Sequence, residues 1–216
     1  MAPNATARVR ICIGIVCAAL SVCSLSAQIS SPLARQDTHD GLAPGKFLIA
    51  PPEAIDPHFA AAVVLLISYD ENGAIGLVVN WPTEIPIARV LENVKSAKRI
   101  ADPVYSGGPV GQEAVFALYR SAKKPGKAAP LFGDVYLAST KSALVHVLSR
   151  KPTPKTLRIY LGYTGWGPGQ LDHEMDLGVW RILPADAQSV FDADPSSVWP
   201  RLVDRTEMRL ALNLGR

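Results

Sequence analysis

A serine placed between a tyrosine and two glycines is the first residue whose surroundings suggest chemistry. In the segment Tyr105-Ser106-Gly107-Gly108, the two glycines would leave the Ser106 hydroxyl accessible as a nucleophile. The surrounding pattern differs from the glycine-x-serine-x-glycine elbow of α/β-hydrolases. A nucleophilic serine also needs a base, and the chain has 4 histidines, at His39, His58, His146 and His173. One sequence does not show which of them folds near Ser106, so a hydrolase stays open as one interpretation.

A second candidate is the glycine-rich segment Gly162–Gly169, which also carries Tyr163 and Trp166. Backbone N–H groups at the start of the following helix could hold an anion, and the aromatic rings could stack on a ligand. Three acidic residues in the next turns (Asp172, Glu174 and Asp176) would repel phosphate. The glycine spacing matches neither a P-loop nor a Rossmann fingerprint. We therefore favour a structural interpretation, in which the glycines allow a tight turn and Trp166 packs into the domain.

Taken together, the two glycine loops define the surface on which we expect a ligand, if the protein binds one. The candidate ligand-facing residues are Tyr105, Ser106, Gly107, Gly108, Tyr163, Trp166 and Gln170. No residue is assigned a catalytic role on this basis. No metal and no cofactor are expected either, because His173 and its acidic neighbours are adjacent on a helix and point about 100° apart.

The N-terminus has the pattern of an export signal. Arg8 and Arg10 precede the uncharged, largely apolar run Ile11–Leu25, and small residues follow it up to Ala27. This run has the length of a signal-peptide core and is short for a membrane span. Three alternatives remain open: an uncleaved membrane anchor, a lipid on Cys23, and a wrongly assigned start codon with a cytosolic protein beginning near Leu42. We expect export to the periplasm or cell envelope.

Cysteine usage and charge limit the chemistry of the rest of the chain. The 3 cysteines, Cys12, Cys17 and Cys23, all lie in the leader, so a cleaved protein has no disulfide or thiol nucleophile. Two of the basic residues behind the formal net charge of +3 also lie there. The remaining chain is close to neutral, and its charge therefore gives no reason to expect nucleic-acid binding.

The elements that must position these residues belong to one domain. The length of 216 residues fits a leader or anchor at 1–27, a linker at 28–44 and a domain at 45–216. Apolar and β-branched runs predict strands, a 3.6-residue period predicts helices, and Asp70-Glu71-Asn72-Gly73 predicts a hairpin turn. The expected strands are 46–50, 62–68, 75–80, 103–106, 114–119, 135–138, 157–161 and 178–183. The expected helices are 87–94, 140–150, a short one from 170, 185–192 and 196–203. Hairpins mixed with helices indicate an α+β domain with a mixed sheet.

Four segments, in this order and spacing, resemble the YqgE/AlgH family of bacterial proteins. They are Gly45–Ala50 with Asp56-Pro57-His58-Phe59 after it, Gly73–Pro82, Val104–Val110 and Leu161–Leu171. The resemblance runs from about Gly41 to Val203. It implies a single α+β domain in which a bifurcated sheet curls into a small closed barrel surrounded by helices. The family carries the label of transcriptional regulator, and no catalytic residue, cofactor or ligand can be transferred from it.

Three functional hypotheses follow, and the N-terminal export signal decides which of them we prefer. The first is a non-catalytic binding or accessory module of the bacterial cell envelope, with an unknown protein or small-molecule partner. The second is a hydrolase with a pocket between the two glycine loops. The third is a cytosolic transcriptional regulator, which requires the misassigned start, because an exported protein does not meet the chromosome. For an exported protein we expect no nucleic-acid partner, and contact with the membrane only through the N-terminal segment.

Overall fold

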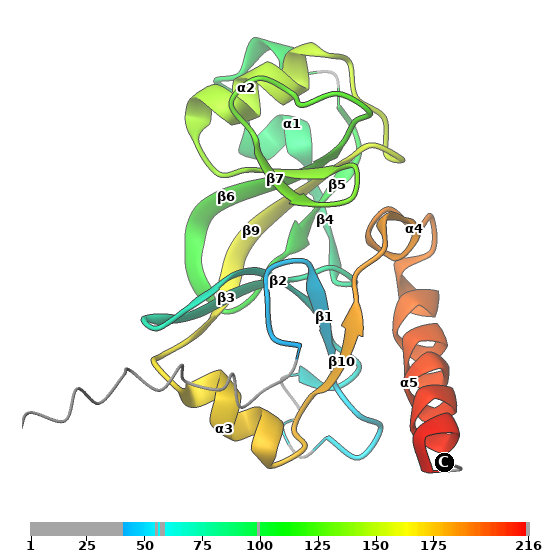
Figure 1. The fold of residues 1–216 in the computed structure, drawn as a ribbon. Coiled ribbons are helices and arrows are strands. Elements are labelled where there is room, and N and C mark those ends of the chain that lie inside the picture. Colours follow the sequence, from blue (N-terminus) through cyan, green and yellow to red (C-terminus); the bar gives the residue numbers. More distant parts are fainter. Residues whose placement is uncertain (1–40, 55, 57–58, 99, 215–216) are drawn as a thin grey trace, which may run out of the picture. The chain divides into compact units, whose positions relative to one another are not determined.

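A computed structural model describes residues 41–54, 56, 59–98 and 100–214, all within the compact unit formed by residues 39–216 (Figure 1). The predicted leader and most of the predicted linker lie outside these residues. The strands are β1 (Lys46–Ile49), β2 (Val63–Asp70), β3 (Gly73–Val78), β4 (Pro82–Pro86), β5 (Pro103–Ser106), β6 (Val110–Arg120), β7 (Ala129–Phe132), β8 (Val135–Ala138), β9 (Leu157–Trp166) and β10 (Arg181–Pro184). The helices are α1 (Ile87–Val90), α2 (Lys141–Ser149), α3 (Gln170–Asp176), α4 (Ala187–Val190) and α5 (Val198–Leu214), with short 3₁₀ turns η2 (Lys95–Ala97) and η3 (Pro195–Ser197).

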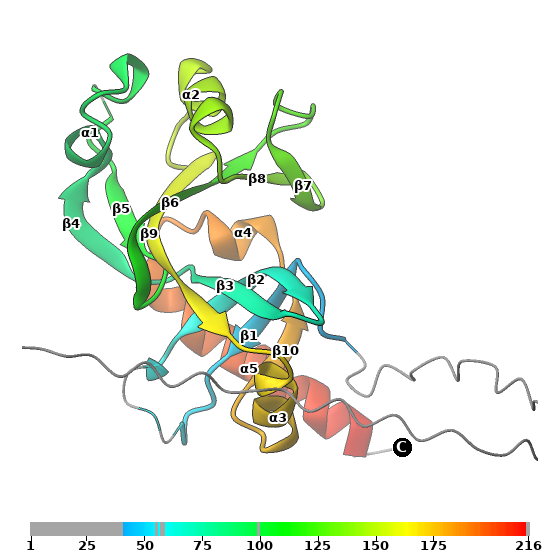
Figure 2. The ribbon, with the colours of Figure 1, turned by 90° about the vertical axis from the view of Figure 1, so that its left-hand side faces the viewer.

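The sheet forks at β9, its long central strand. The main path runs β10-β1-β2-β3-β9-β6-β8-β7, and β5 and β4 branch from it. One edge of β9 pairs antiparallel with β6. The other edge pairs in parallel with β5 at Tyr160 and Leu161, and then antiparallel with β3 from Thr164 to Trp166. The result is a bifurcated sheet that curls as a half-barrel with helices around it (Figures 1 and 2). The α+β class and the mixed sheet expected from the sequence are confirmed. The curled, bifurcated sheet that the family resemblance implied is confirmed as well, in the form of a half-barrel.

Glycines occupy the fork because backbone meets backbone there. A side chain at Gly107 would place its Cβ 2.3 Å from the carbonyl oxygen of Gly162, and one at Gly108 would lie 2.5 Å from the amide nitrogen of Thr164. Gly108 also has φ +148°, and Gly162 has φ +69°, which disfavour other residues. The carbonyl of Gly107 accepts a 2.9 Å hydrogen bond from the Val78 amide and so ties β3 to β5. The glycine pairs of the sequence are thus explained by close packing at the fork.

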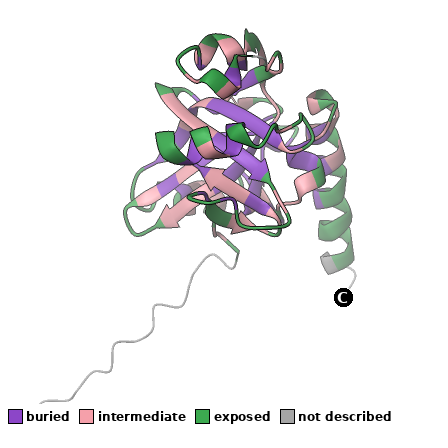
Figure 3. Cartoon of the chain, turned by 90° about the horizontal axis from the view of Figure 1, so that it is seen from above, coloured by how far each residue is buried: buried purple, intermediate pink, exposed green. Residues whose placement is uncertain are grey.

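The buried side chains form three clusters. Figure 3 shows the buried residues, which lie mainly on the strands. The largest includes Phe47, Leu65 and Tyr160 and receives the first half of α5 through Val198 and Leu202. A second cluster lies under α1 and α2. The third lies beneath α3 and contains two tryptophans. In the described part of the chain, no helix is both long and apolar enough to cross a membrane.

The largest departure from the sequence prediction concerns the glycine segment after Leu161. Strand β9 does not end there but continues through Gly162 to Trp166, and only Gly167–Gly169 form the turn before α3. The prediction of a loop from Gly162 was wrong because the glycines were read as turn signals. Gly162 is a strand residue whose missing side chain admits the backbone of Gly108, and only Gly167 and Gly169 lie in the turn.

Smaller departures have equally local causes. Strands β4 and β7, both containing proline, were not predicted, since proline argues against a strand except at edges such as these. Helix α1 is one turn rather than eight residues, and α5 continues well beyond Val203. The β2–β3 hairpin is present, but its central residues are Glu71 and Asn72, with Gly73 (φ +129°) already paired with Asp70.

Candidate functional site

A cleft of about 660 Å³ lies beside α3 in the described part of the chain. Three parts of the chain form it: described residues between 50 and 59 (Ala50, Pro51, Glu53, Ala54, Asp56 and Phe59), the fork region at Pro109–Val110 and Thr164–Trp166, and residues between Gln170 and Arg181. The β9–α3 turn brings the third part back over the second, as the yellow strand and helix in Figure 2 show. Its volume is in the usual range for sites that take a small molecule.

Two tryptophans and one carboxylate form the most ordered part of the cleft. The indole N–H groups of Trp166 and Trp180 both donate to the same oxygen of Glu174, each at 2.8 Å. The two rings meet edge to face, with centroids 6.1 Å apart and planes at 79°. Their side chains are 6% and 5% exposed, so they form the floor of the cleft rather than free-standing walls. This arrangement fixes both rings and the carboxylate in one geometry.

Helix α3 supplies the carboxylate and a second polar group in register. Gln170 and Glu174 are four residues apart on one face of the helix, and the Gln170 amide donates to Glu174 Oε1 at 2.9 Å. The Gln170 carbonyl oxygen accepts from the Gly167 amide at 3.1 Å. Gln170 therefore links the turn that follows β9 to the carboxylate beneath the cleft.

Further aromatic contacts extend the floor toward the segment at 50–59. The ring of Phe59 meets Trp180 edge to face at 5.7 Å and stacks on Trp81 at 6.1 Å. Phe59 and Trp180 both border the cleft, whereas Trp81 lies behind Phe59. Leu177 and Val179, 66% and 39% exposed, give the cleft an apolar rim beyond the end of α3.

Of the candidate ligand-facing residues, Trp166 and Gln170 border this cleft. Gly107 and Gly108 are buried at the fork, and the cleft is bordered instead by the next two residues, Pro109 and Val110. Tyr163 is half-buried and packs edge to face on Phe116 at 6.1 Å. The two glycine segments thus do meet, but through their backbones, and the cleft opens beside their junction.

Ser106, the candidate nucleophile, is half-buried at the end of β5 and does not border the cleft. Two of the candidate bases also lie elsewhere: His146 is on α2, next to Gly126, and His173 is exposed on α3. His39 and His58 lie outside the described residues. Among the residues that the structure describes, no histidine, cysteine or serine borders the cleft, and its one hydroxyl side chain, Thr164, is 4% exposed.

Tyr105, another candidate, belongs to the main core. Its side chain is 3% exposed, and the guanidinium of Arg158 lies over its ring at 5.0 Å. Arg158 donates to the backbone carbonyls of Pro154 and Asp192, each at 2.7 Å. Burial raises the pKa of Tyr105 and, more strongly, that of the fully buried Tyr160, so both phenols are neutral at physiological pH. Tyr105 therefore has a packing role in this structure.

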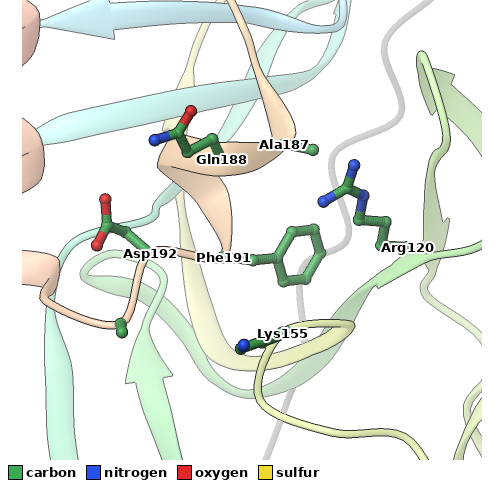
Figure 4. Close-up of a pocket in the computed structure, with 7 residues that line it drawn as sticks. Arg120, Lys155, Ala187, Gln188, Phe191 and Asp192 are labelled. Atoms are coloured by element: carbon green, nitrogen blue, oxygen red, sulfur yellow. The ribbon is translucent and has the colours of Figure 1, made fainter.

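The second hollow, of about 530 Å³, lies between the β6 end, the turn before β9 and α4. Figure 4 shows the ring of Phe191 in its centre, with Arg120 and Lys155 beside it and Gln188 and Asp192 on the far side. Arg120 is already paired with Asp134 at 2.7 Å, and both side chains are well exposed. Its polar groups do not converge, and we therefore treat the cleft beside α3 as the candidate site.

Acidic residues on α3 do not form a metal centre in the described part of the chain. There, no three His, Cys, Asp or Glu side chains are grouped so that they could hold one ion. The Asp172 carboxylate instead accepts a 2.6 Å hydrogen bond from the Tyr69 hydroxyl and fastens α3 to the β2–β3 hairpin.

The fold and the comparisons with known proteins define the class of this chain. A family model described as AlgH-like matches residues 47–211, which is most of the chain. A protein named UPF0301 protein from Anaeromyxobacter dehalogenans is 38% identical over 183 residues, which cover 79% of this chain and 90% of the relative. Another from Thioalkalivibrio sulfidiphilus is 34% identical over 173 residues, covering 79% of this chain and 92% of that protein.

Solved structures agree with the sequence matches. The solution structure of the AlgH protein from Pseudomonas aeruginosa superposes with a TM-score of 0.64 at 30% identity, and the match covers 84% of this chain and 97% of that one. A crystal structure of protein DIP2367 from Corynebacterium diphtheriae has a TM-score of 0.63 at 23% identity, covers 76% of this chain and 87% of that one, and supports the fold alone. This chain belongs to the AlgH-like family of uncharacterised proteins, as its motifs had suggested.

Sequence reasoning missed several residues of the cleft, namely Phe59, Glu174 as a hydrogen-bond acceptor, and Trp180. Glu174, and not the neighbouring Gln170 or a backbone carbonyl, accepts the Trp166 N–H. The sequence did contain one indication of this arrangement. The chain has only 4 tryptophans, and two of them flank α3, at Trp166 and Trp180. Indoles on either side of a short acidic helix predict that a carboxylate of the helix accepts their N–H groups.

Proposed function

We propose that this protein is a non-catalytic binding module of the bacterial cell envelope, and that the cleft beside α3 is its ligand-binding site. The observation that carries the proposal is the pair of tryptophans locked onto Glu174 at the cleft floor. Aromatic and apolar surface with a few fixed polar groups is the usual composition of a small-molecule site. The leader with Arg8, Arg10 and Ile11–Leu25 supports the envelope as its location.

Binding is favoured over catalysis by what borders the cleft. The described lining provides fixed aromatic rings, carboxylates and one arginine, but no nucleophile with a base beside it. Ser106, the residue on which the hydrolase hypothesis rested, is directed by β5 to another part of the fork, where its backbone N–H donates to the Trp81 carbonyl. A ligand held against a pre-ordered floor needs little reorganisation of the protein, which favours affinity.

The first prediction tests the cleft with two matched valine variants. Val110 (41% exposed) borders the cleft, and Val145 (40% exposed) lies on α2. A chemically diverse set of small molecules is titrated into ¹⁵N-labelled protein, and the indole N–H signals of the tryptophans are followed by NMR. We expect some ligands to shift the Trp166 and Trp180 signals, and we expect Val110→Trp, which fills the cleft, to weaken their binding at least about tenfold.

The control variant Val145→Trp adds the same bulk and the same extra indole away from the cleft, and it should bind as the wild type does. A screen in which no ligand moves the Trp166 and Trp180 signals contradicts the proposal. Equal weakening by both variants, or no weakening by Val110→Trp, would also contradict it.

A further inference from the structure

Charge is divided unequally within the domain, although its total is close to neutral. Residues 87–157 contain 12 basic and 4 acidic residues, which is a net charge of +8. The rest of residues 41–216 contains 7 basic and 13 acidic residues, which is a net charge of −6. The total for the chain conceals this separation and therefore indicated no anionic partner. Opposite charges on two parts of one domain give it a preferred orientation in front of a charged surface.

The segments that carry the basic residues of 87–157 lie at the end of the domain that includes α1 and α2, opposite α3 (Figure 1). The loop before β7 lies against α2, since a side chain at Gly126 would place its Cβ 2.8 Å from Nε2 of His146. Lys155, between α2 and β9, borders the same hollow as Arg120. We name this surface the basic end. It carries eight of the nine lysines of the chain, namely Lys95, Lys98, Lys123, Lys124, Lys127, Lys141, Lys151 and Lys155.

The positive charge of these lysines is available to a partner. All eight side chains are exposed, and among the described residues none of them forms an ion pair. Arg120 differs, because it is paired with Asp134 at 2.7 Å. In the rest of the domain the arginines Arg181, Arg201 and Arg205 are each paired with a carboxylate. The excess of positive charge at the basic end is thus both larger and less compensated.

The composition of the basic end favours a lipid surface over nucleic acid. Proteins hold single strands with exposed aromatic rings, and they read duplexes with side chains placed in a groove. In the described part of the chain, none of the large exposed apolar side chains is aromatic. Lysines attract anionic headgroups without a groove or a fixed register. Val145, 40% exposed and four residues after Lys141 on α2, adds an apolar contact for the bilayer interface.

From these observations we infer that the basic end is a docking surface for a bilayer that contains anionic phospholipid. The inference goes beyond the proposed function, because it concerns a different surface and needs no ligand in the cleft. It adds a second membrane contact to the one expected through the N-terminal segment. The same lipids repel the rest of the domain, with its net charge of −6. The cleft beside α3 would therefore face away from the bilayer and stay open to small molecules.

Sedimentation with lipid vesicles tests the inference. The protein used is residues 28–216, the form that cleavage of the leader leaves, which contains the whole compact unit of residues 39–216. Vesicles contain phosphatidylcholine alone or with about 40% phosphatidylglycerol. We expect the protein to sediment with the anionic vesicles and to stay in solution with the neutral ones. Binding should weaken at least about tenfold between about 50 and 300 mM salt, because salt screens exposed charges.

Two variants of equal net charge locate the contact. Lys123→Gln with Lys124→Gln removes two charges from the basic end and should weaken binding to the anionic vesicles at least about tenfold. The control, Lys46→Gln with Arg209→Gln, removes two positive charges from the rest of the domain and should change binding less than about twofold. Circular dichroism verifies that each variant is folded.

Single cysteines report the orientation of the bound domain, because residues 28–216 contain no cysteine of their own. Val145→Cys on α2 and Leu177→Cys just after α3 are both at exposed positions. Each is labelled with a dye whose emission increases in apolar surroundings. We expect the dye at position 145 to respond to the anionic vesicles and the dye at position 177 to show no response.

The inference is overturned if the protein does not sediment with the anionic vesicles, or if salt and the Lys123/Lys124 variant leave sedimentation unchanged. Equal responses of the two dyes, or equal weakening by both charge variants, would also exclude the basic end as the docking surface. Binding of a DNA duplex or a single-stranded oligonucleotide at physiological salt, without binding to vesicles, would assign the basic end to nucleic acid instead. The cleft is tested separately, since Val110→Trp should leave vesicle binding unchanged, and either proposal can fail while the other stands.

Discussion

At the scale of single residues, one hydrogen bond accounts for the burial of Trp166 and the partial burial of Glu174. A half-buried carboxylate is costly unless it is hydrogen-bonded, and a buried indole leaves its N–H unsatisfied unless an acceptor is near. The 2.8 Å hydrogen bond from the Trp166 indole to Glu174 satisfies both groups. The same carboxylate oxygen also accepts from the Trp180 indole. The sequence predicted that Trp166 is buried, and its 6% exposure confirms this. It could not identify Glu174 as the acceptor, because that depends on the orientation of α3.

The residue-scale prediction is that Trp166→Ala destabilises the domain by about 3–5 kcal/mol, as large-to-small aromatic substitutions in cores do. The substitution also leaves Glu174 with one donor fewer. Trp166→Phe keeps an aromatic ring in the core and loses the N–H with part of the ring system, so it should cost less, about 1–3 kcal/mol. Urea denaturation followed by circular dichroism measures both. An unfolding free energy of Trp166→Ala within about 0.5 kcal/mol of the wild type would show that the indole is not an anchor.

At the scale of elements, sequence patterns located most strands and failed where tertiary context decides. Short apolar runs correctly predicted β1, β2 and β5. Thr140 was also recognised as the N-cap of α2, where its side chain accepts a hydrogen bond from the Ala143 amide. The course of β9 through Gly162 was missed, because only the fork explains why a strand there needs glycines. For the cleft, sequence reasoning correctly predicted Trp166 and Gln170. Trp180 is brought to it by the β1–β10 pairing, and Phe59 packs on Trp180; no local pattern predicts either contact.

The element-scale prediction concerns how α4 and α5 are held at acidic pH. Asp186 caps α4 through the Ser189 amide and pairs with Arg205 of α5 at 2.8 Å. Burial raises the pKa of Asp186, but the hydrogen bonds from Arg205 and Ser189 outweigh it and hold the pKa below 3.8. The pKa of Asp192, which pairs with Arg201 at 2.7 Å, is lowered in a similar way, since hydrogen bonds from Asp194 and Arg201 outweigh desolvation.

A lowered carboxylate pKa stabilises the folded state above the unfolded pKa, and this stabilisation is lost as the pH falls through the folded pKa. These two groups should therefore contribute fully at pH 7 and lose their contribution only below about pH 4. We expect the double variant Asp186→Asn and Asp192→Asn to be less stable than the wild type at neutral pH, with the difference shrinking toward pH 3. Urea denaturation across this range measures it. A constant difference at every pH would contradict the role of the two charges.

At the scale of the whole molecule, the compartment decides which function the fold can serve. The AlgH-like fold is shared with relatives of uncharacterised function, so the fold alone does not assign a role to the cleft. The segment at 1–27 lies outside the described residues, and export therefore remains a prediction from sequence. If the domain is exported, its cleft meets the small molecules of the envelope.

The last prediction tests export directly. Residues 1–40 are fused to alkaline phosphatase lacking its own signal, which is active only outside the cytoplasm. We expect activity, because Arg8 and Arg10 followed by an uncharged apolar run form the two parts that the export machinery recognises. The matched control Ile15→Asp with Leu20→Asp interrupts the apolar run and should abolish activity while the fusion protein is still made. An inactive wild-type fusion that is intact on a blot would contradict export. It would also return the chain to the cytoplasm, where the cleft would have to find its ligand among the small molecules of that compartment.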